Sequence, residues 1–334
     1  MDKEKIVIDY ERPKLHRRVF AFIIDLIVFM FAFFTVFISV RAIMNQTDRY
    51  SSAIENVETT RLESGIYVEE SGNLYDVVSL YDDDDDLSDS QRQVYYLDAI
   101  DSFIDYVEDE LGEEKAQEVL DNYYSYLLDE DLTYDGITYF VEGVDGVPTE
   151  NPECTASIAE YNQNVYEPYI DTNIQTYLNS LFEQYNLDIQ YLFKILFYIE
   201  IPISAIIGGI LVFYVPGLFF KRGRQTLGRA LYRIGLVDSR YLAVKIGRYT
   251  ANWVISYFVI LVLSFLTLGI PLIISFSLMA FSSKKQTFSE YMLGIQEVSL
   301  EKQKIYYSRA EIRADRITAN KPAIDFSPEE KVHL

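Results

Sequence analysis

The sequence predicts a mainly α-helical membrane protein: a multi-pass bundle of four membrane segments, the last two forming a hairpin, with a large, mostly helical extracytoplasmic domain inserted after the first. Three observations predict this class. Apolar residues gather in three runs, 19–40, 201–220 and 253–281. The region between the first two runs, 45–189, is too polar to cross a bilayer. Basic residues flank the runs on the sides that would face the cytoplasm.

The first apolar run, Val19–Val40, is long enough to cross a membrane. Its 22 residues rise roughly 33 Å as a helix, which matches the hydrocarbon core of a bilayer. The run contains an acid and has no small-residue cleavage site before Arg41, unlike a cleaved signal peptide. We therefore expect an uncleaved membrane helix over 19–40, preceded by a cytoplasmic tail over 1–18.

Asp25 is the unusual residue of that helix. An ionised carboxylate near the bilayer centre costs roughly 2.5–3.5 kcal/mol, so it must face a bundle interior with a partner or a proton. Arg18 lies seven residues earlier on the same helix face. Its long side chain extends either toward Asp25 or out to the lipid headgroups.

Residues 41–190 form the predicted extracytoplasmic domain, and their charge differs from that of the rest. Region 45–189 holds 36 acidic residues against four basic ones, whereas the remainder has a net charge of +10. Three-to-four-residue spacing of apolar and tyrosine side chains predicts helices over 89–130 and 155–187, with the tyrosines as core residues. Ser71–Gly72 and Asp135–Gly136 predict two tight hairpins.

Several kinds of site are not indicated. The single cysteine, Cys154, leaves no internal disulfide, and two histidines without a cysteine cluster do not suggest zinc. The sequence offers no nucleophile–base arrangement and no phosphate-binding loop. We therefore expect no enzyme, no metal and no cofactor. The basic stretch beside the membrane lacks aromatic platforms, so nucleic acid is not expected as a partner.

The C-terminal half contains the other membrane segments. The segment 191–220 carries small residues four apart, Ser204/Gly208 and Ala205/Gly209, which let another helix approach closely. Eight basic residues against one acid mark 221–250 as a cytoplasmic loop.

The last apolar stretch, 251–281, is interrupted near Leu268–Pro271 and has basic flanks at both ends. A hairpin places both flanks in the cytoplasm, together with the tail 282–334, whereas a single crossing would place one outside. We favour the hairpin, with three crossings as the alternative. Both chain termini are then cytoplasmic, in a multi-pass protein of the cell membrane.

A short sequence echo follows two membrane segments. Gln225–Thr226–Leu227 follows the second segment, and Gln286–Thr287–Phe288 follows the last. Each leads within about ten residues to a strand-like stretch, Ile234–Asp238 or Ile295–Leu300. The echo predicts that both exits lie on the same side of the membrane.

Three motifs together resemble the RDD family of bacterial integral membrane proteins. The first is Arg18, Ala21, Ile24 and Asp25; the second runs from Gln225–Arg229 to Gly235–Asp238; the third runs from Lys285–Glu290 to Gly294. The resemblance covers about 15–44 and 190–300. The chain departs from the family pattern at Glu290, where the family has its second aspartate, and at Ser289, where it has histidine. Region 45–189 is an insertion where the family has a short loop.

The family resemblance implies transport as a proposed activity and Arg18, Asp25 and Glu290 as candidate functional residues. Two functions stay open: transport of an ion or small solute using the intramembrane carboxylate Asp25, and a structural or sensory membrane protein whose acidic outer domain binds a partner. The predicted partners are the lipid bilayer and a cation or basic partner at the outer domain. Because four segments make a thin pathway, we also expect a homo-oligomer.

Overall fold

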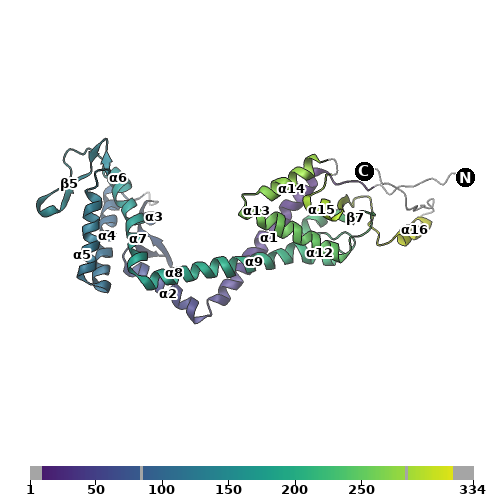
Figure 1. Cartoon of the computed structure of the whole chain (residues 1–334), viewed down its shortest axis with the longest axis horizontal. Helices are drawn as coiled ribbons and strands as arrows, with labels where there is room; N and C mark the ends of the chain where they lie inside the picture. The colour runs from purple at the N-terminus through teal and green to yellow at the C-terminus, as the bar shows by residue number, and fades with distance from the viewer. Residues whose placement is uncertain (1–9, 83–85, 283–284, 319–334) are drawn as a thin grey trace. The chain divides into compact units, whose positions relative to one another are not determined.

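The computed structural model describes residues 10–82, 86–282 and 285–318, which are mainly helical (Figure 1). Three helices are long and apolar enough to cross a membrane: Leu15–Met44, Glu183–Phe219 and Ile246–Leu266. The chain divides into two compact units. We call Ile43–Tyr198 the insert unit, and Met1–Ala42 with Ile199–Leu334 the membrane unit.

The insert unit is a set of helices with three small hairpins. Its helical segments are α2 (Asp48–Glu63), α3 (Val77–Asp82), α4 (Asp89–Leu111), α5 (Glu113–Leu127), α6 (Ile158–Tyr161), η2 (Asn162–Tyr166), η3 (Tyr169–Ile174), α7 (Gln175–Leu181) and α8 (Glu183–Ile195), with a short turn η1 (Val144–Gly146). Its strands pair antiparallel as β1 (Tyr67–Glu70) with β2 (Asn73–Asp76), β3 (Thr133–Tyr134) with β4 (Ile137–Thr138), and β5 (Phe140–Glu142) with β6 (Pro148–Glu150).

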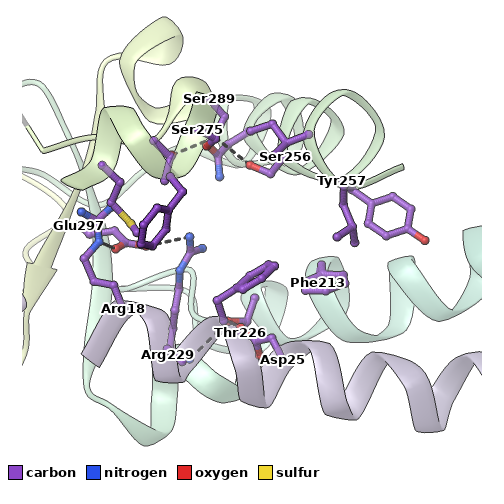
Figure 2. A pocket seen from close by; sticks show the side chains of 18 of the residues that line it. Arg18, Asp25, Phe213, Thr226, Arg229, Ser256, Tyr257, Ser275, Ser289 and Glu297 are labelled. Atoms are coloured by element: carbon purple, nitrogen blue, oxygen red, sulfur yellow. Dashed lines mark hydrogen bonds and ion pairs between the residues drawn. The ribbon is translucent and has the colours of Figure 1, made fainter. Parts of the chain in front are cut away.

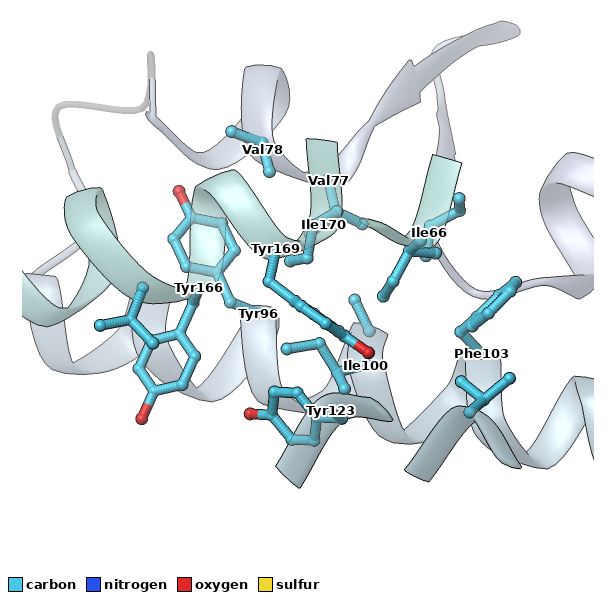
Figure 3. Packing of buried hydrophobic residues seen from close by; sticks show 14 of the residues in the cluster. Ile66, Val77, Val78, Tyr96, Ile100, Phe103, Tyr123, Tyr166, Tyr169 and Ile170 are labelled. Carbon is cyan, nitrogen blue, oxygen red and sulfur yellow. The ribbon is translucent and has the colours of Figure 1, made fainter. Parts of the chain in front are cut away.

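The core of the insert unit is rich in tyrosine, as expected from the spacing. Figure 3 shows Tyr96, Tyr123, Tyr166 and Tyr169 packed among aliphatic side chains. Both predicted hairpin turns are present, and their two central residues all have positive φ, which matches the twist of paired strands. The fold of the insert unit was therefore predictable in its local elements.

The membrane unit contains the long apolar helices and one small sheet. Its segments are α1 (Leu15–Met44), η4 (Leu196–Glu200), α9 (Ile201–Gly209), η5 (Ile210–Tyr214), α10 (Val215–Phe219), α11 (Leu227–Leu231), β7 (Ile234–Asp238), α12 (Ile246–Val254), η6 (Ile255–Val262), α13 (Leu263–Leu266), α14 (Ile270–Phe281), α15 (Phe288–Leu293), β8 (Ile295–Ser299) and α16 (Arg309–Thr318). The first helix is longer than the predicted 19–40, and α12 begins five residues before the predicted 251.

The last apolar stretch is a helical hairpin. The helix that begins at Ile246 ends at Leu266, and α14 begins at Ile270 after a tight turn. Gly269 in that turn has φ 86°, a left-handed conformation that glycine adopts without steric cost. With 12 residues, α14 is shorter than a typical membrane span.

Small residues allow close helix packing, as predicted. A methyl group added at Gly208 would lie 3.3 Å from the backbone nitrogen of Phe33 on α1. One added at Gly209 would collide with the ring of Tyr257. The hydroxyl of Tyr257 also donates a hydrogen bond to the carbonyl oxygen of Ala205. Helix α9 therefore contacts α1 and η6 through its small side chains.

The strands β7 and β8 pair antiparallel, with Ile234 opposite Ser299 and Asp238 opposite Ile295. The segment before α1 joins them: the amide of Ser299 donates to the carbonyl of Glu11, and Tyr10 stacks on Tyr241 at 5.7 Å. The N-terminal segment and both loops that carry the sequence echo therefore meet in one polar subdomain.

Candidate functional site: a buried charged cluster between two cavities

The sequence echo is an internal structural repeat. The side-chain amide of Gln225 donates to the carbonyl of Ile234, and that of Gln286 donates to the carbonyl of Ile295, both at 2.8 Å. Thr226 and Thr287 cap the N-termini of α11 and α15 in the same way. The two copies, 224–238 and 285–299, are 61 positions apart.

Backbone conformation follows the repeat as closely as the hydrogen bonds do. Arg224 and Lys285 occupy equivalent positions and have φ of 47° and 45°. Arg233 and Gly294 are also equivalent, with φ of 51° and 60°. Residues Leu236 and Glu297 are equivalent and face each other across the sheet. The two copies are thus related by an approximate two-fold axis through that pair.

Four ionisable side chains meet where α1 contacts the repeat. Glu297 of β8 accepts from Arg18 of α1 and pairs with Arg229 of α11 at 2.8 Å (Figure 2). Arg18 also pairs with Glu290 of α15 at 3.1 Å and donates to the carbonyl of Lys285. Arg18, Glu290 and Glu297 are each at least nine-tenths buried. We call these residues, with Asp25, the charged cluster.

Asp25 lies in the same cluster but does not pair with Arg18. One carboxylate oxygen accepts from the hydroxyl of Thr226, and the other accepts from the amide of Gly228 at 2.7 Å. A methyl group added at position 228 would collide with the carbonyl oxygen of Ala21. Glycine there lets the N-terminus of α11 approach α1 closely enough to bind the carboxylate.

The cluster carries three acids and two arginines, so one acid lacks a balancing charge. Burial raises the pKa of Glu290 to about 7, helped by the neighbouring Glu297 and opposed by Arg18 and Arg229. The two arginines hold the pKa of Glu297 below its usual value despite its burial. Glu297 contacts both arginines, whereas Glu290 shares Arg18 with it and does not pair with Arg229, so Glu290 is the acid of the two that binds a proton more readily.

Two cavities meet at this cluster. The first, of about 420 Å³, lies among α1, α12, η6 and α14. Its charged end holds Arg18, Asp25, Arg229 and Glu297, whereas Phe213 and Tyr257 lie toward the other end (Figure 2).

The second cavity, of about 310 Å³, is lined by the N-terminal segment and the start of the second repeat. Both cavities are bounded by Arg18, Met279 and Glu297. The Arg18–Glu297 ion pair therefore borders both a cavity among the apolar helices and one among polar segments.

Polar side chains in the wall of the first cavity differ in how they are satisfied. Ser256 and Ser289 share a hydrogen bond of 2.8 Å, and Ser275 accepts from the amide of Phe288. The Oδ1 atom of Asn252 and the Nε1 atom of Trp253 are buried and have no hydrogen-bond partner within the described part of the chain. Such orphaned groups are uncommon in folded proteins.

No family model, curated protein or solved structure matches this chain.

The structure brings together all three residues expected from the sequence. Arg18 and Glu290 are in direct contact, and Asp25 joins them through α11 rather than through Arg18. Two further members, Arg229 and Glu297, were not singled out. Arg229 occupies the position in the first repeat that Glu290 occupies in the second, and Glu297 is the acid of a strand-like stretch. The sequence echo could have identified both residues, because it aligns Arg229 with Glu290 and marks the stretch that contains Glu297.

Across residues 10–82, 86–282 and 285–318 no three histidine, cysteine or acidic side chains gather in a way that would hold a metal ion. Two arginines contact the acids of the cluster. The arrangement can bind a proton on its third acid.

Proposed function

We propose that the chain is an RDD-like integral membrane protein that transports a small solute through the two cavities, coupled to a proton on the charged cluster. The observation that carries this proposal is the buried Arg18–Glu297 pair, whose two residues line both cavities. A buried ion pair between two cavities is expensive as a purely structural contact. It suits a barrier that opens when its charges are rearranged.

The proton and the barrier act on the same arginine. When Glu290 is ionised, Arg18 is attracted by two carboxylates; when Glu290 is protonated, Glu297 alone retains it. The position of Arg18 therefore depends on the proton. Asp25 anchors α11 to α1 and keeps Arg229 beside Glu297. In this proposal Glu290 carries the proton, Arg18 and Glu297 form the barrier, and Asp25 positions the group.

The proposed topology has four crossings with both termini in the cytoplasm and the insert unit outside. Pairing of β7 with β8 supports it, because the stretch between them must leave the membrane on the side where it entered. The N-terminal segment joins the same subdomain. Surrounding basic residues favour the cytoplasm for that side.

Topology is tested by single cysteines in a Cys154→Ser background. Leu268→Cys, at the exposed turn between α13 and α14, is expected to react with a membrane-impermeant thiol reagent outside intact cells. Arg240→Cys and Lys302→Cys are expected to react only after the membrane is permeabilised. Labelling of position 302 but not position 240 from outside would mean three crossings.

Transport is tested in proteoliposomes that contain a pH-sensitive dye. Inward gradients of sodium, potassium and a panel of small organic solutes are imposed in turn, and internal pH is recorded. We expect at least one gradient to drive proton movement in the wild type. Glu290→Gln and Asp25→Asn should abolish it, while Asp188→Asn, a buried acid of the insert unit, should not. If no gradient moves protons, the transport proposal fails.

A non-transporting structural or sensory role is the second candidate, favoured by one observation. Each oxygen of Asp25 accepts one hydrogen bond at the N-terminus of α11, from the Thr226 hydroxyl and the Gly228 amide, as expected for a residue that holds α11 against α1. In that case Asp25→Asn lowers thermal stability and there is no flux to lose. The acidic insert unit would then bind a basic partner, a role that pull-down with a basic peptide at low and high salt would test.

A further inference from the structure

The first cavity has features that indicate what it binds. Most of its wall is apolar or aromatic, and the unsatisfied atoms are one amide oxygen and one indole N–H on consecutive residues, Asn252 and Trp253. Asn252 is 3 % exposed, so bulk water does not satisfy it. Both residues line the cavity, with the unsatisfied atoms buried in its wall. Amide oxygen and nitrogen are interchangeable by a flip, so Asn252 can supply either an acceptor or a donor, and Trp253 can supply a donor.

The cavity also reaches the outer surface of the helices. Phe22 of α1 is 38 % exposed, and Ile273 and Phe276 of α14 are 62 % and 45 % exposed, although all three line the cavity. In a membrane-spanning protein these side chains face lipid. A molecule dissolved in the bilayer therefore has a path to the cavity between α1 and α14.

Charge at the polar end narrows the class of ligand. Arg18, Arg229, Asp25 and Glu297 contribute two positive and two negative charges, and each already has a protein partner. An anionic head would meet Glu297 and Asp25 without a free cation to balance it. A head that is uncharged and carries both a donor and an acceptor fits Asn252 and Trp253 without disturbing the ion pairs.

We propose that this cavity binds a lipid-soluble amphiphile with an uncharged hydrogen-bonding head, of the alcohol or amide class, which enters laterally between α1 and α14. Its head lies at Asn252 and Trp253, and its apolar body packs against Phe213, Tyr257 and Leu261. A cavity of about 420 Å³ is within the size range of small-molecule sites. Binding of the amphiphile does not depend on the proposed function. Only the step that makes this amphiphile the transported solute rests on it.

Trp253 is the only tryptophan of the chain, so its fluorescence reports the site directly. Full-length protein in nanodiscs is titrated with 2-bromododecan-1-ol, whose bromine quenches indole on contact. Two probes with bromine at the same carbon are compared: 2-bromododecane, which has no head, and 2-bromododecanoate, which is anionic. We expect saturable quenching by the alcohol, reversed by unbrominated dodecanol. The alcohol should bind about fivefold to tenfold more tightly than the headless probe, the effect of one or two hydrogen bonds.

Asn252→Leu should weaken binding of the alcohol by about fivefold and leave the headless probe unchanged. The matched control is Asn122→Leu on the exposed face of α5, which should change neither. If Asn252→Leu does not fold, the comparison of the three probes in the wild type still decides. Quenching that rises linearly with probe and is equal for alcohol and alkane would show only bulk lipid contact and would overturn the inference. Tighter binding of the anionic probe would overturn it as well.

Binding is measured without any gradient, so its outcome is separate from that of the flux assay. Saturable alcohol binding with no proton movement would retain the site and reject transport. Proton movement driven by another solute, without alcohol binding, would retain transport and reject the amphiphile as its cargo.

Discussion

The two copies of the repeat share a backbone but carry opposite charges at one position. Both have a capping threonine, a glutamine that binds a strand carbonyl, and left-handed residues at the same two places. Three residues after each threonine, the first copy has Arg229 and the second has Glu290. The backbone therefore builds two equivalent sockets with opposite side chains.

Helix α1 explains the difference. It passes both sockets and presents Asp25 to the first and Arg18 to the second. Each socket carries the charge complementary to the α1 residue that it meets, and Glu297 near the two-fold axis joins both arginines. The repeat provides two copies of the same backbone structure. Helix α1 occurs once, and its contacts require different charges in the two copies.

The largest expected effect comes from exchanging the two charges. Breaking a buried ion pair costs about 3–5 kcal/mol, so Arg229→Glu and Glu290→Arg should each destabilise the protein by about that much. The double variant should not recover stability, because Arg18 and Asp25 stay in place and now meet like charges. The measurement is thermal unfolding in detergent. Recovery in the double variant would mean that the sockets are interchangeable and that α1 does not set their charge.

A second test uses pH to separate the copies, since only the second has an acid, Glu290, three residues after its capping threonine. The folded protein keeps a proton on Glu290 up to about pH 7, whereas the unfolded chain loses it near pH 4.5. Between these values the folded state binds more protons, so stability falls as pH rises, by up to about 3 kcal/mol in total.

Glu290→Gln should reduce that slope. Burial also raises the pKa of Asp101, Glu167 and Asp171 in the insert unit, so these acids retain the rest of it. Glu297, with its lowered pKa, contributes the opposite slope only below its unfolded value of 4.5, so it does not mask the effect. The check is the unfolding temperature at half-unit steps from pH 5 to 7.5 in wild type and variant. A slope that Glu290→Gln leaves unchanged would assign the proton to another group.

The capping threonines offer a smaller contrast. Thr226 caps α11 and donates to the Asp25 carboxylate, whereas Thr287 caps α15 without an acid from α1. Loss of a cap costs about 1 kcal/mol, and loss of a hydrogen bond to a charged group costs about 1.5–3 kcal/mol. Thr226→Val should therefore lower stability by about 2–4 kcal/mol and Thr287→Val by about 1 kcal/mol. Equal losses of stability would mean that the hydrogen bond from Thr226 to Asp25 does not stabilise the contact between α1 and α11.

Much of the fold was predictable because it depends on local signals. Apolar run length predicted the long helices, the Asp135–Gly136 pair predicted a tight hairpin, and tyrosine spacing predicted the buried face of the insert unit. The echo at Gln225 and Gln286 predicted two strand-like stretches, and the structure shows that they pair with each other. Each signal depends on neighbouring residues, so a single sequence contains it.

The partners within the site were less predictable because they are set by contacts across more than 200 positions. Helix periodicity placed Arg18 and Asp25 on one face and suggested that they pair, yet each binds a different copy of the repeat. Glu297 lies in β8, a strand whose other residues are mostly buried and uncharged. The register of β8 against β7 places Glu297 beside both arginines, and the sequence of β8 alone does not indicate this. The two cavities depend on the three-dimensional packing of the helices. Residue patterns along the chain do not predict where that packing leaves empty volume.

The smallest expected effect concerns the left-handed residue that follows each short helix. Arg233 has φ 51° and Gly294 has φ 60°, and a non-glycine residue there costs roughly 1–2 kcal/mol. The Arg233 side chain is exposed, so little is lost by removing it. Arg233→Gly should therefore stabilise the protein by up to about 1 kcal/mol, and Gly294→Ala should destabilise it by about 1–2 kcal/mol. Both are measured by thermal unfolding beside Lys302→Gly, an exposed site without positive φ, as control. If Arg233→Gly destabilises instead, the arginine makes a contact that its copy lacks, and the two halves differ in more than the charges that face α1.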